Sequence, residues 1–568
     1  MRVHYPRTPH LPWSPGAAPD DVRAGELWGL RGREVVVTEK LDGENTTLYA
    51  DGLHARSLDS AHHPSRAWVK ALQGRIGAEI PQGWRVCGEN LYARHSIAYE
   101  DLESWFYGFS VWDDHRRCLD WDRTVRFLRQ LGVPVPRVLW RGAFDERALR
   151  ALRLDTSRQE GYVVRTVEGF GPEEFGQRVA KWVRGGHVQT DTHWMHAAVV
   201  ENGLSPNAAL WAVRSGAAPD AESLAAALGV APGNPAAAGA AVADVSARLD
   251  ALERSGDARL AGVLAALLHG TRRGPLAGRL VAPLGMPLAR QVGDLVGLHP
   301  NLHRPCPDED RRTGLVRMSF AADLGVLHAV AGAVATDTAA REQVDWSALY
   351  AEDAGLLGGA EVPEGLREAF TGLDTEPADR CWAEAREAYA QGRIRTAEEA
   401  VAATWRWRTG DFPRLIHLVG PSGSGKSTFA RGLNGVDAYV SLDELREERG
   451  SRADQRANGD VLRRGLDRLD SALAGGGTVV WDATSLNPHQ RSLVHAVAHR
   501  RDALTTHAVV LVDEEEHVRR NAVRPHPVPP DVLTSQLHRF VPPYPGQAHR
   551  TWYIGPGGTV EDTEGTVA

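Results

Sequence analysis

One short segment near the carboxyl end constrains the folding of this chain more than any other. Residues 420–427 read Gly-Pro-Ser-Gly-Ser-Gly-Lys-Ser and match the pattern G-x-x-x-x-G-K-[ST]. The apolar run Leu415-Ile416-His417-Leu418-Val419 comes directly before them. Such a run predicts a buried strand that ends in a glycine-rich turn, with a helix beginning near Lys426. We therefore expect a parallel α/β sheet that binds phosphates at its carboxyl edge.

This loop pattern predicts a role for each of its polar groups. Backbone N–H groups of such a loop surround the β-phosphate of a nucleoside triphosphate (NTP), and its lysine reaches the β and γ oxygens. The hydroxyl after the lysine helps to hold Mg²⁺, so Ser427 is a predicted metal ligand. The predicted nucleotide-binding residues are Gly420, Ser422, Gly423, Ser424, Gly425, Lys426, Ser427 and Thr428.

The acceptor of the phosphate has to be inferred from segments beyond the loop. Asp443 follows a predicted strand, where a carboxylate can take a proton from an attacking hydroxyl, and Arg446 can bind an acceptor phosphate. This D-x-x-R pair and the segment Trp481-Asp482-Ala483-Thr484-Ser485 resemble the polynucleotide 5′-kinases. The resemblance implies that Arg524 lies over the transferred phosphate and that Arg520 shares the task. A small-molecule kinase of the same fold, acting on a sugar or nucleoside, is the alternative.

A second motif lies near the amino end, where residues 40–45 read Lys-Leu-Asp-Gly-Glu-Asn after the β-branched run Val35-Val36-Val37-Thr38. A lysine attacks phosphorus only as the neutral amine, although its ordinary pKa is about 10.4. Neighbouring cations, or the metal ion on ATP, favour that neutral form. Asp-Gly alone is a common hairpin turn, so the motif needs support from other segments.

That support comes from segments that follow in a fixed order. With them, residues 30–185 resemble the covalent nucleotidyltransferases and, within these, the phage-type ATP-dependent RNA ligases. The resemblance implies that Lys40 is the lysine that becomes adenylylated. It also implies that Arg56 contacts the nucleotide or the 3′ end, Glu89 the ribose hydroxyls, Phe109 the adenine ring, Glu160 a metal ion and Lys181 the phosphates.

The last motif departs from the family pattern. The family often has two lysines two residues apart, whereas Val183 occupies the second place here, and Arg178 or Arg184 would have to substitute. The departure supports a different reading, a sensor whose ligase fold binds nucleotide or RNA without turnover. The motif details favour RNA over DNA, as does the lack of an OB-fold signature after residue 185.

The pattern of residues predicts a multidomain chain of α+β and α/β classes. In residues 1–200, β-branched and aromatic runs broken by Asp-Gly predict antiparallel sheet, and the resemblance implies that this is an ATP-grasp-like ligase domain. Residues 201–410 are rich in alanine and leucine at helical spacing and predict a mainly α-helical domain. Residues 411–568 alternate strand and helix patterns and predict a parallel sheet, and the resemblance implies that this is a P-loop kinase domain.

The histidines of the middle segment raise the question of a third active site. His299 and His303 are four residues apart, but Pro300 and Pro305 argue against one helix presenting both. The segment has no His-Asp dipeptide and no paired H-x-T repeats. We therefore favour a structural or RNA-docking module over a catalytic one such as a phosphatase. The histidines in question are His269, His299, His303 and His328.

The bulk properties of the sequence restrict its environment. None of the four cysteines forms a C-x-x-C pair, which is typical of reduced thiols and not of a disulfide framework or a zinc site. No apolar run approaches the roughly 18 residues of a membrane helix, and no basic-then-apolar leader is present. We expect a cytoplasmic protein without a membrane partner. The net charge of −8 argues against extensive wrapping of nucleic acid but allows a local basic groove.

Together these patterns predict an enzyme that heals and seals RNA ends. The kinase would phosphorylate a 5′-OH with an NTP, and Asp443 would act as its base. The ligase would then join that 5′-phosphate to a 3′-OH through lysyl-AMP and RNA-adenylate intermediates. The predicted cofactors are ATP and Mg²⁺ or Mn²⁺, and the predicted partner is RNA with broken ends.

Overall fold

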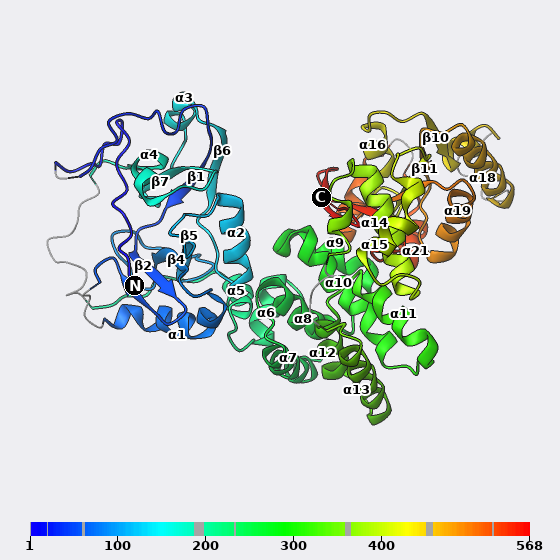
Figure 1. Cartoon of the computed structure of the whole chain (residues 1–568), viewed down its shortest axis with the longest axis horizontal. Helices are drawn as coiled ribbons and strands as arrows, with labels where there is room; N and C mark the ends of the chain where they lie inside the picture. Colours follow the sequence, from blue (N-terminus) through cyan, green and yellow to red (C-terminus); the bar gives the residue numbers. More distant parts are fainter. Residues whose placement is uncertain are drawn as a thin grey trace. The chain divides into compact units, whose positions relative to one another are not determined.

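The computed structural model describes residues 2–19, 21–58, 63–186, 198–231, 234–357, 365–449, 458–524 and 527–567. The chain forms two compact units, Met1–Val263 and Leu264–Ala568 (Figure 1). The first contains two antiparallel sheets, helices follow, and the second contains a mostly parallel sheet. The predicted fold class is therefore confirmed.

The two sheets of the first unit are joined at the predicted lysine motif. The chain leaves one sheet after Lys40 and enters the other at Glu44, so residues 41–43 form the crossing. All strand pairs in both sheets are antiparallel. The first sheet has the order β6(Val138–Ala143), β1(Glu34–Lys40), β7(Gly161–Thr166), β8(Val179–Val183). The second has the order β3(Gly52–Ala55), β2(Glu44–Tyr49), β4(Arg85–Asn90), β5(Phe106–Trp112).

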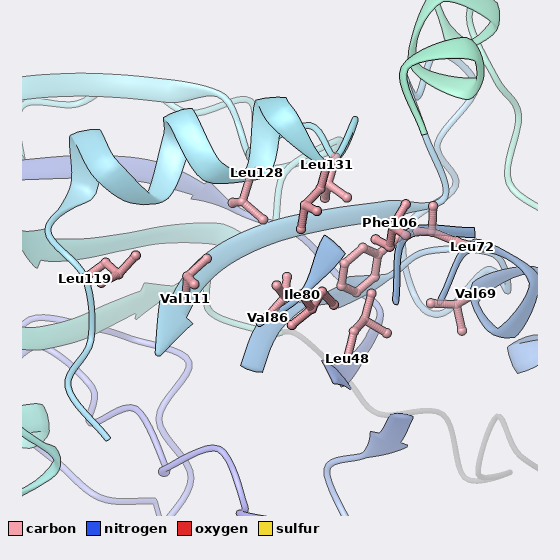
Figure 2. Close-up of a cluster of buried hydrophobic side chains, with 12 residues drawn as sticks. Leu48, Val69, Leu72, Ile80, Val86, Phe106, Val111, Leu119, Leu128 and Leu131 are labelled. Atoms are coloured by element: carbon pink, nitrogen blue, oxygen red, sulfur yellow. The ribbon is translucent and has the colours of Figure 1, made fainter. Parts of the chain in front are cut away.

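The second sheet buries one face under two helices. Leu72 of α1(Ala67–Ile76) and Leu128 of α2(Trp121–Gln130) pack with Val86 and Phe106 in the core that Figure 2 shows. Side chains of a strand alternate between faces, so Cys87 and Glu89 of β4 point the other way. Cys87 packs there with Phe175 and with Val179 of β8, which places the first sheet on that side. Glu89 thus faces the space between the sheets.

The predicted domain of residues 201–410 does not form one packing unit, because the boundary between the two compact units falls inside it, between Val263 and Leu264. Its first helices belong to the ligase-like unit, where Arg214 donates to Asp257 at 2.7 Å and Arg75 donates to the Ser215 carbonyl at 3.0 Å. These helices are α5(Ala208–Arg214), α6(Ala221–Leu228), α7(Pro235–Ala251) and the first half of α8(Gly256–Leu268). The later helices complete the core of the P-loop sheet instead.

The second unit is built on a six-stranded sheet. Its order is β10(Ala438–Ser441), β11(Thr478–Asp482), β9(Arg414–Val419), β12(Leu504–Val510), β13(Arg550–Ile554), β14(Val560–Glu564). Only β14 runs antiparallel to its neighbour, and it closes one edge. Ala277 of α9(Arg273–Leu284) and Met286 of α10(Met286–Leu302) pack against Val419 and Val509 of the sheet. Helices that precede the P-loop by more than 100 residues therefore form part of its core.

A third helix from the middle segment, α14(Thr375–Ala390), is tied to the same sheet by ion pairs. Its Asp379 accepts from Arg550 of β13 at 3.2 Å, and its Arg380 donates to Asp502 at 2.8 Å. The other helices are α3(Glu146–Arg150), α4(Phe175–Arg178), α11(Asp308–Ser319), α12(Leu324–Val334), α13(Thr338–Asp353), α15(Ala397–Ala403), α16(Lys426–Arg431), α17(Leu442–Glu447), α18(Asn458–Ala474), α19(Pro488–Arg500), α20(Glu514–Ala522) and α21(Pro530–Arg539).

Pro300 and Pro305 were expected to prevent one helix from presenting both His299 and His303. The helix α10 does continue through Pro300, but it ends at Leu302, with His303 as its C-cap. Pro300 lies inside the last turn of α10, and the rings of His299 and His303 are 5.5 Å apart. A proline this close to a helix end removes only one hydrogen bond, so the helix continues through it.

No single described helix is long and apolar enough to cross a membrane, and α11 and α12 pass that test only as a pair bent by 107°.

Arg290 provides a test of how α10 is fixed to the sheet edge. Its guanidinium, 4% exposed, contacts Asp294 at 3.1 Å, Asp562 of β14 at 2.8 Å, and Glu564. Arg290→Met leaves the partly buried Asp562 and Glu564 without this cation and Asp294 with Arg273 alone, so we expect a loss of about 3 kcal/mol in the free energy of unfolding of this unit. Hydrogen–deuterium exchange measures this loss as faster exchange of the amides of β13 and β14.

Arg317→Met is the matched control. Arg317 of α11 pairs with Glu387 of α14, but its side chain is 52% exposed. Solvent screens such a pair, so its loss should cost at most about 1 kcal/mol. Equal protection of β14 in the two variants would contradict the role assigned to Arg290.

Candidate functional site

The first candidate site surrounds the amine of Lys40, at the end of β1. Lys40 is opposite Gly161 in the β1–β7 register, and Glu160 directly precedes that glycine. Lys40 Nζ donates to Glu160 Oε2 at 2.5 Å, with side chains 23% and 6% exposed. Gly161 has to be glycine, because a Cβ there would lie 1.9 Å from the Trp182 carbonyl oxygen. This close strand approach places the carboxylate beside the amine.

Glu89 reaches the same place from the other sheet. Its Oε1 accepts from the Gly43 backbone N–H at 3.3 Å. Gly43 permits the approach, since a Cβ there would lie 2.5 Å from the Asn90 carbonyl oxygen. Burial raises the pKa of Glu89 to about 8, with Glu160 and Asp42 adding to the rise and Lys40 opposing it. The raised pKa favours the protonated form of Glu89 near neutral pH, and a nearby cation would favour its ionised form.

The two lysines of this site have opposite pKa shifts. Burial alone would lower the pKa of Lys40, but the carboxylates of Glu160 and Glu89 outweigh it and raise that pKa. Burial lowers the pKa of Lys181 on β8, and the charge of Lys40 lowers it further. Lys40 is therefore fully protonated in the free protein near neutral pH. Attack on phosphorus requires that its contact with Glu160 first be broken.

The remainder of the lysine motif is structural. Asp42 Oδ2 accepts from the Ser96 and Ile97 backbone N–H groups, both at 2.9 Å, and from the Ser96 hydroxyl at 2.6 Å. Glu44 forms a buried bidentate ion pair with Arg66. These contacts fix both ends of the 41–43 crossing. Sequence reasoning assigned neither role, because Ser96 and Arg66 lie outside the motifs.

The remaining ligase-type predictions lie at different distances from the lysine. Arg56 is exposed just beyond β3, and its charge acts on Lys181, so it lies at the edge of the site. The Phe109 ring is partly buried between the sheets, 5.3 Å from the Tyr5 ring. Among the described residues, no contact joins Phe109 to Lys40. The stacking of Phe109 on adenine therefore stays a prediction.

Neither arginine proposed in place of the second lysine is directed at the site. Arg178 donates to Glu174 at 2.5 Å, and Arg184 donates to the Thr156 carbonyl oxygen. The Val183 side chain is buried at 4% exposure. The altered motif therefore leaves Lys181 as the cation that β8 contributes beside Lys40.

A histidine that no motif marks adjoins Lys181. The amino-terminal segment pairs with β8 through the backbone of Lys181. The Lys181 N–H donates to the Pro9 carbonyl at 2.9 Å, and the Lys181 carbonyl accepts from the Leu11 N–H at 2.7 Å. His10 is 2% exposed and lies 3.2 Å from an Asp21 oxygen. Burial and then the charge of Lys181 lower the pKa of His10 to about 4. The signal was weak in sequence, since His10 stands in a proline-rich stretch without periodicity.

The second candidate site is the glycine loop after β9. Gly420, Gly423 and Gly425 have φ of 151°, 81° and 106°, which favour glycine. Lys426 is 7% exposed and donates to the Pro421 carbonyl oxygen at 2.7 Å. Burial lowers the pKa of Lys426 to about 8, although Asp482 and Asp443 act in the other direction. The buried Ser424 hydroxyl finds no partner in the described part of the chain, as expected of a loop that accommodates an anion.

Polar residues from three neighbouring segments converge on this loop. Asp482, at the end of β11, accepts from the Tyr439 hydroxyl at 2.6 Å, and Ser427 lies beside that same hydroxyl. Asp443 is 65% exposed and accepts from Arg446 at 2.6 Å. The predicted base and the predicted phosphate clamp thus bind each other in the free protein. Ser427 and Asp482 are the oxygen donors suited to a divalent cation.

The predicted lid arginines differ in their contacts. Arg520 of α20 donates to the Ser424 carbonyl at 2.7 Å and to the Pro556 carbonyl at 2.6 Å, so it braces the loop. Arg524 is exposed, and its charge lowers the pKa of Lys426. Gln536 of α21 accepts from the Ser422 N–H at 2.8 Å, a contact that sequence reasoning missed. Thr428, the last predicted loop residue, is exposed on α16.

Lysine usage points to the same two sites. The sequence contains four lysines, and three of them are Lys40, Lys181 and Lys426, while Lys70 is exposed on α1. Arginine serves as the cation almost everywhere else. An amine differs from a guanidinium because it can lose its proton and act as a nucleophile. Lys40 is therefore suited to nucleophilic attack, whereas Lys426 supplies a compact positive charge to the phosphate loop.

Comparisons with known proteins agree with this division. Residues 33–183 match the family described as RNA ligase, and residues 415–543 match the family described as AAA domain. No curated protein matches the sequence. A Naegleria gruberi RNA ligase solved with ATP and Mn is 19% identical, covering 28% of this chain and 52% of its own, with a TM-score of 0.22.

Two further solved structures show the same level of likeness. An archaeal ATP-dependent RNA ligase is 14% identical, covering 37% of this chain and 50% of its own, with a TM-score of 0.24. A sugar kinase from a Janibacter species is 21% identical, covering 26% of this chain and 86% of its own, with a TM-score of 0.21. The chain thus spans about half the length of the ligases it matches. The chain thus carries one segment similar to RNA ligases, residues 33–183, and one similar to AAA domains, residues 415–543, which contains the phosphate loop.

Proposed function

We propose that this protein heals and seals broken RNA, phosphorylating 5′-OH ends with one unit and joining them to 3′-OH ends with the other. The observation that carries the proposal is the Lys40 amine held 2.5 Å from Glu160, between two sheets that also bring Glu89 and Lys181 to it. A phosphate loop on the same chain supplies the kinase half.

In the ligase half, the Lys40 amine attacks the α-phosphorus of ATP. A P–N bond forms, the bond to pyrophosphate breaks, and the amine loses its proton. Glu160 holds the amine in place until ATP arrives, and Lys181 offsets the phosphate charge beside it. AMP then passes to the RNA 5′-phosphate, and attack by the 3′-OH releases AMP as the strands join.

In the kinase half, the 5′-hydroxyl attacks the γ-phosphorus of an NTP bound by the loop. Asp443 takes the hydroxyl proton, and Arg446, its partner in the free protein, turns to the acceptor phosphate. Arg520 keeps the loop in shape, and Arg524 provides an exposed cation near Lys426. These steps depend on positioning and charge, which the fixed backbone contacts supply.

Both sites fit a divalent cation by their donors. At the ligase site burial raises the pKa of Glu89, and the nearby carboxylates of Glu160 and Asp42 add to the rise. A cation held by Glu160 would reduce the repulsion between these carboxylates. At the kinase site Ser427 and Asp482 would do so. Mg²⁺ or Mn²⁺ there would neutralise phosphate charge and orient the leaving oxygen.

Lys40→Arg tests the nucleophile. Arginine keeps the positive charge beside Glu160 but does not deprotonate, so it cannot form the covalent adduct. We expect α-labelled ATP with Mg²⁺ to label the parent chain on a denaturing gel and to leave Lys40→Arg unlabelled, while 5′ phosphorylation persists.

Lys70→Arg is the control, since Lys70 is exposed on α1 and should not affect labelling. A covalent band that survives Lys40→Arg would place the nucleophile on another lysine. A parent chain without any band, but with bound nucleotide, would favour the sensor reading.

The lysine pKa values can be tested without substrate. Trace acetylation of the intact protein across pH 7–11, read by mass spectrometry of each lysine peptide, follows the neutral amine. A pKa of about 8 predicts that Lys426 becomes reactive at lower pH than Lys70, which is exposed. The raised pKa of Lys40 predicts reactivity only at the highest pH values. Coincident profiles for Lys40 and Lys426 would refute the opposite shifts.

Asp443→Asn tests the kinase base. Loss of a general base typically costs 10²–10⁴-fold in rate, so we expect transfer from γ-labelled ATP to a 5′-OH oligoribonucleotide to fall by about that factor. Adenylylation of Lys40 should not change. Glu444→Gln, which alters an exposed carboxylate on the same helix, should leave both activities intact.

The acceptor itself decides between the two kinase readings. Parallel assays with a 5′-OH oligoribonucleotide, a nucleoside and a free sugar should give transfer to the oligonucleotide. Preference for the sugar or nucleoside would establish a small-molecule kinase joined to a ligase. Sealing of nicked and broken RNA with defined ends then tests the combined pathway.

A further inference from the structure

Three histidines from separate elements meet inside the second unit, on one face of its sheet. His417 lies on β9, His507 on β12 and His495 on α19. The two strands are neighbours, and their parallel register places His507 opposite His417. One ring nitrogen from each residue lies within 4.8 Å of those of the other two.

The cluster is buried, and its hydrogen bonding is incomplete. His417 and His507 are 0% exposed, and His495 is partly buried. The Nε2 atoms of His495 and His507 share a hydrogen bond of 2.8 Å. Within the described residues, however, Nδ1 of His417 and Nδ1 of His507 have no partner. Buried polar atoms without a partner are rare, and an unseen water or ion is a common reason.

We propose that His417, His495 and His507 bind a zinc ion behind the phosphate loop. Three imidazole nitrogens are an established ligand set for zinc, with water in the fourth position. The Ser485 hydroxyl lies 2.8 Å from His417 Nε2, the outer-shell contact that orients a ligating ring. The lack of oxygen donors among these three ligands disfavours Mg²⁺ and sets the site apart from that of the nucleotide metal.

The charges around the cluster limit its affinity. Arg491, 3% exposed, donates to the Ser485 carbonyl at 3.2 Å and to the Val541 carbonyl at 2.9 Å, and its charge reaches all three rings. His549 also lies within electrostatic range of His495 and His507. The Arg491 charge repels a cation but also keeps the rings neutral, as ligation requires, whereas burial lowers the pKa of His549 to about 4 and leaves it uncharged near neutral pH. We therefore expect weaker binding than at a cysteine-rich zinc site.

The position of the cluster links it to the kinase site. His417 precedes Gly420 by three residues, on the strand that enters the loop. Ser485 belongs to the segment after β11, where the Thr484 carbonyl accepts from the Gly420 N–H at 3.0 Å. Ser485 has a φ of 48°, a strained conformation for a residue with a side chain. Zinc would join β9 and β12 to α19, the helix that follows this segment, so its primary role would be structural.

Zinc binding to the full-length, tag-free chain tests the proposal. After treatment with chelator and dialysis, the protein is titrated with ZnCl₂ in competition with a chromogenic chelator. We expect one equivalent to bind to the parent chain and to His489→Gln, whose histidine is exposed on the same helix α19. His495→Gln should bind at least about tenfold more weakly. Equal binding to both variants, or no bound equivalent in the parent chain, would overturn the assignment.

Two further readouts support the titration, and the first of them needs only the parent chain. Co²⁺ in place of Zn²⁺ should give the intense visible absorption of a four-coordinate nitrogen site in the parent chain, and the pale spectrum of hydrated Co²⁺ would refute it. Zinc should also raise the unfolding temperature of the parent chain and of His489→Gln but not that of His495→Gln. Lys40 adenylylation should be equal in all three proteins, which separates failure of this site from failure of the ligase.

Discussion

The contact between Lys40 and Glu160 is the constraint on which the first unit depends. It exists because β1 and β7 pair antiparallel with Lys40 opposite Gly161, and because Gly161 lets the β8 backbone approach. The chain then crosses to the second sheet within residues 41–43, where Asp42 is held by three hydrogen bonds. That crossing brings Glu89 to the same amine. A site assembled from two sheets tolerates little displacement of either.

Lys40 and Lys426 show how the surroundings of an amine determine its pKa. Desolvation opposes the charged form of both Lys40 and Lys426. At Lys40 the carboxylates of Glu160 and Glu89 prevail, so the amine is stored in protonated form. At Lys426 the nearest contact is the neutral Pro421 carbonyl, and burial prevails. The first lysine must be released by its substrate before it reacts, whereas the second only has to exchange one acceptor for another.

Local patterns allowed much of this to be predicted. The strands around Lys40, the strand before Gly420 and the helix at Lys426 follow from apolar runs and turn residues, which act over a few positions. Contacts between distant segments were not predictable from one sequence. His10 reaches Lys181 from an amino-terminal stretch without periodicity, and Arg66 pairs with Glu44 across 22 residues. The continuation of α10 through Pro300 was missed because packing of its apolar face outweighs one lost hydrogen bond.

The docking of α14 has a practical consequence for separating the two activities. Sequence similarity to P-loop proteins begins at residue 415, which invites a fragment that starts there. Such a fragment would lose Asp379 and Arg380, and with them the partners of Arg550 and Asp502. It would also uncover Val419 and Val509 where Ala277 and Met286 now cover them. An excised P-loop unit would therefore fold cooperatively only if it kept the helices from residue 264 onward, well over a hundred residues that carry no nucleotide-binding motif of their own.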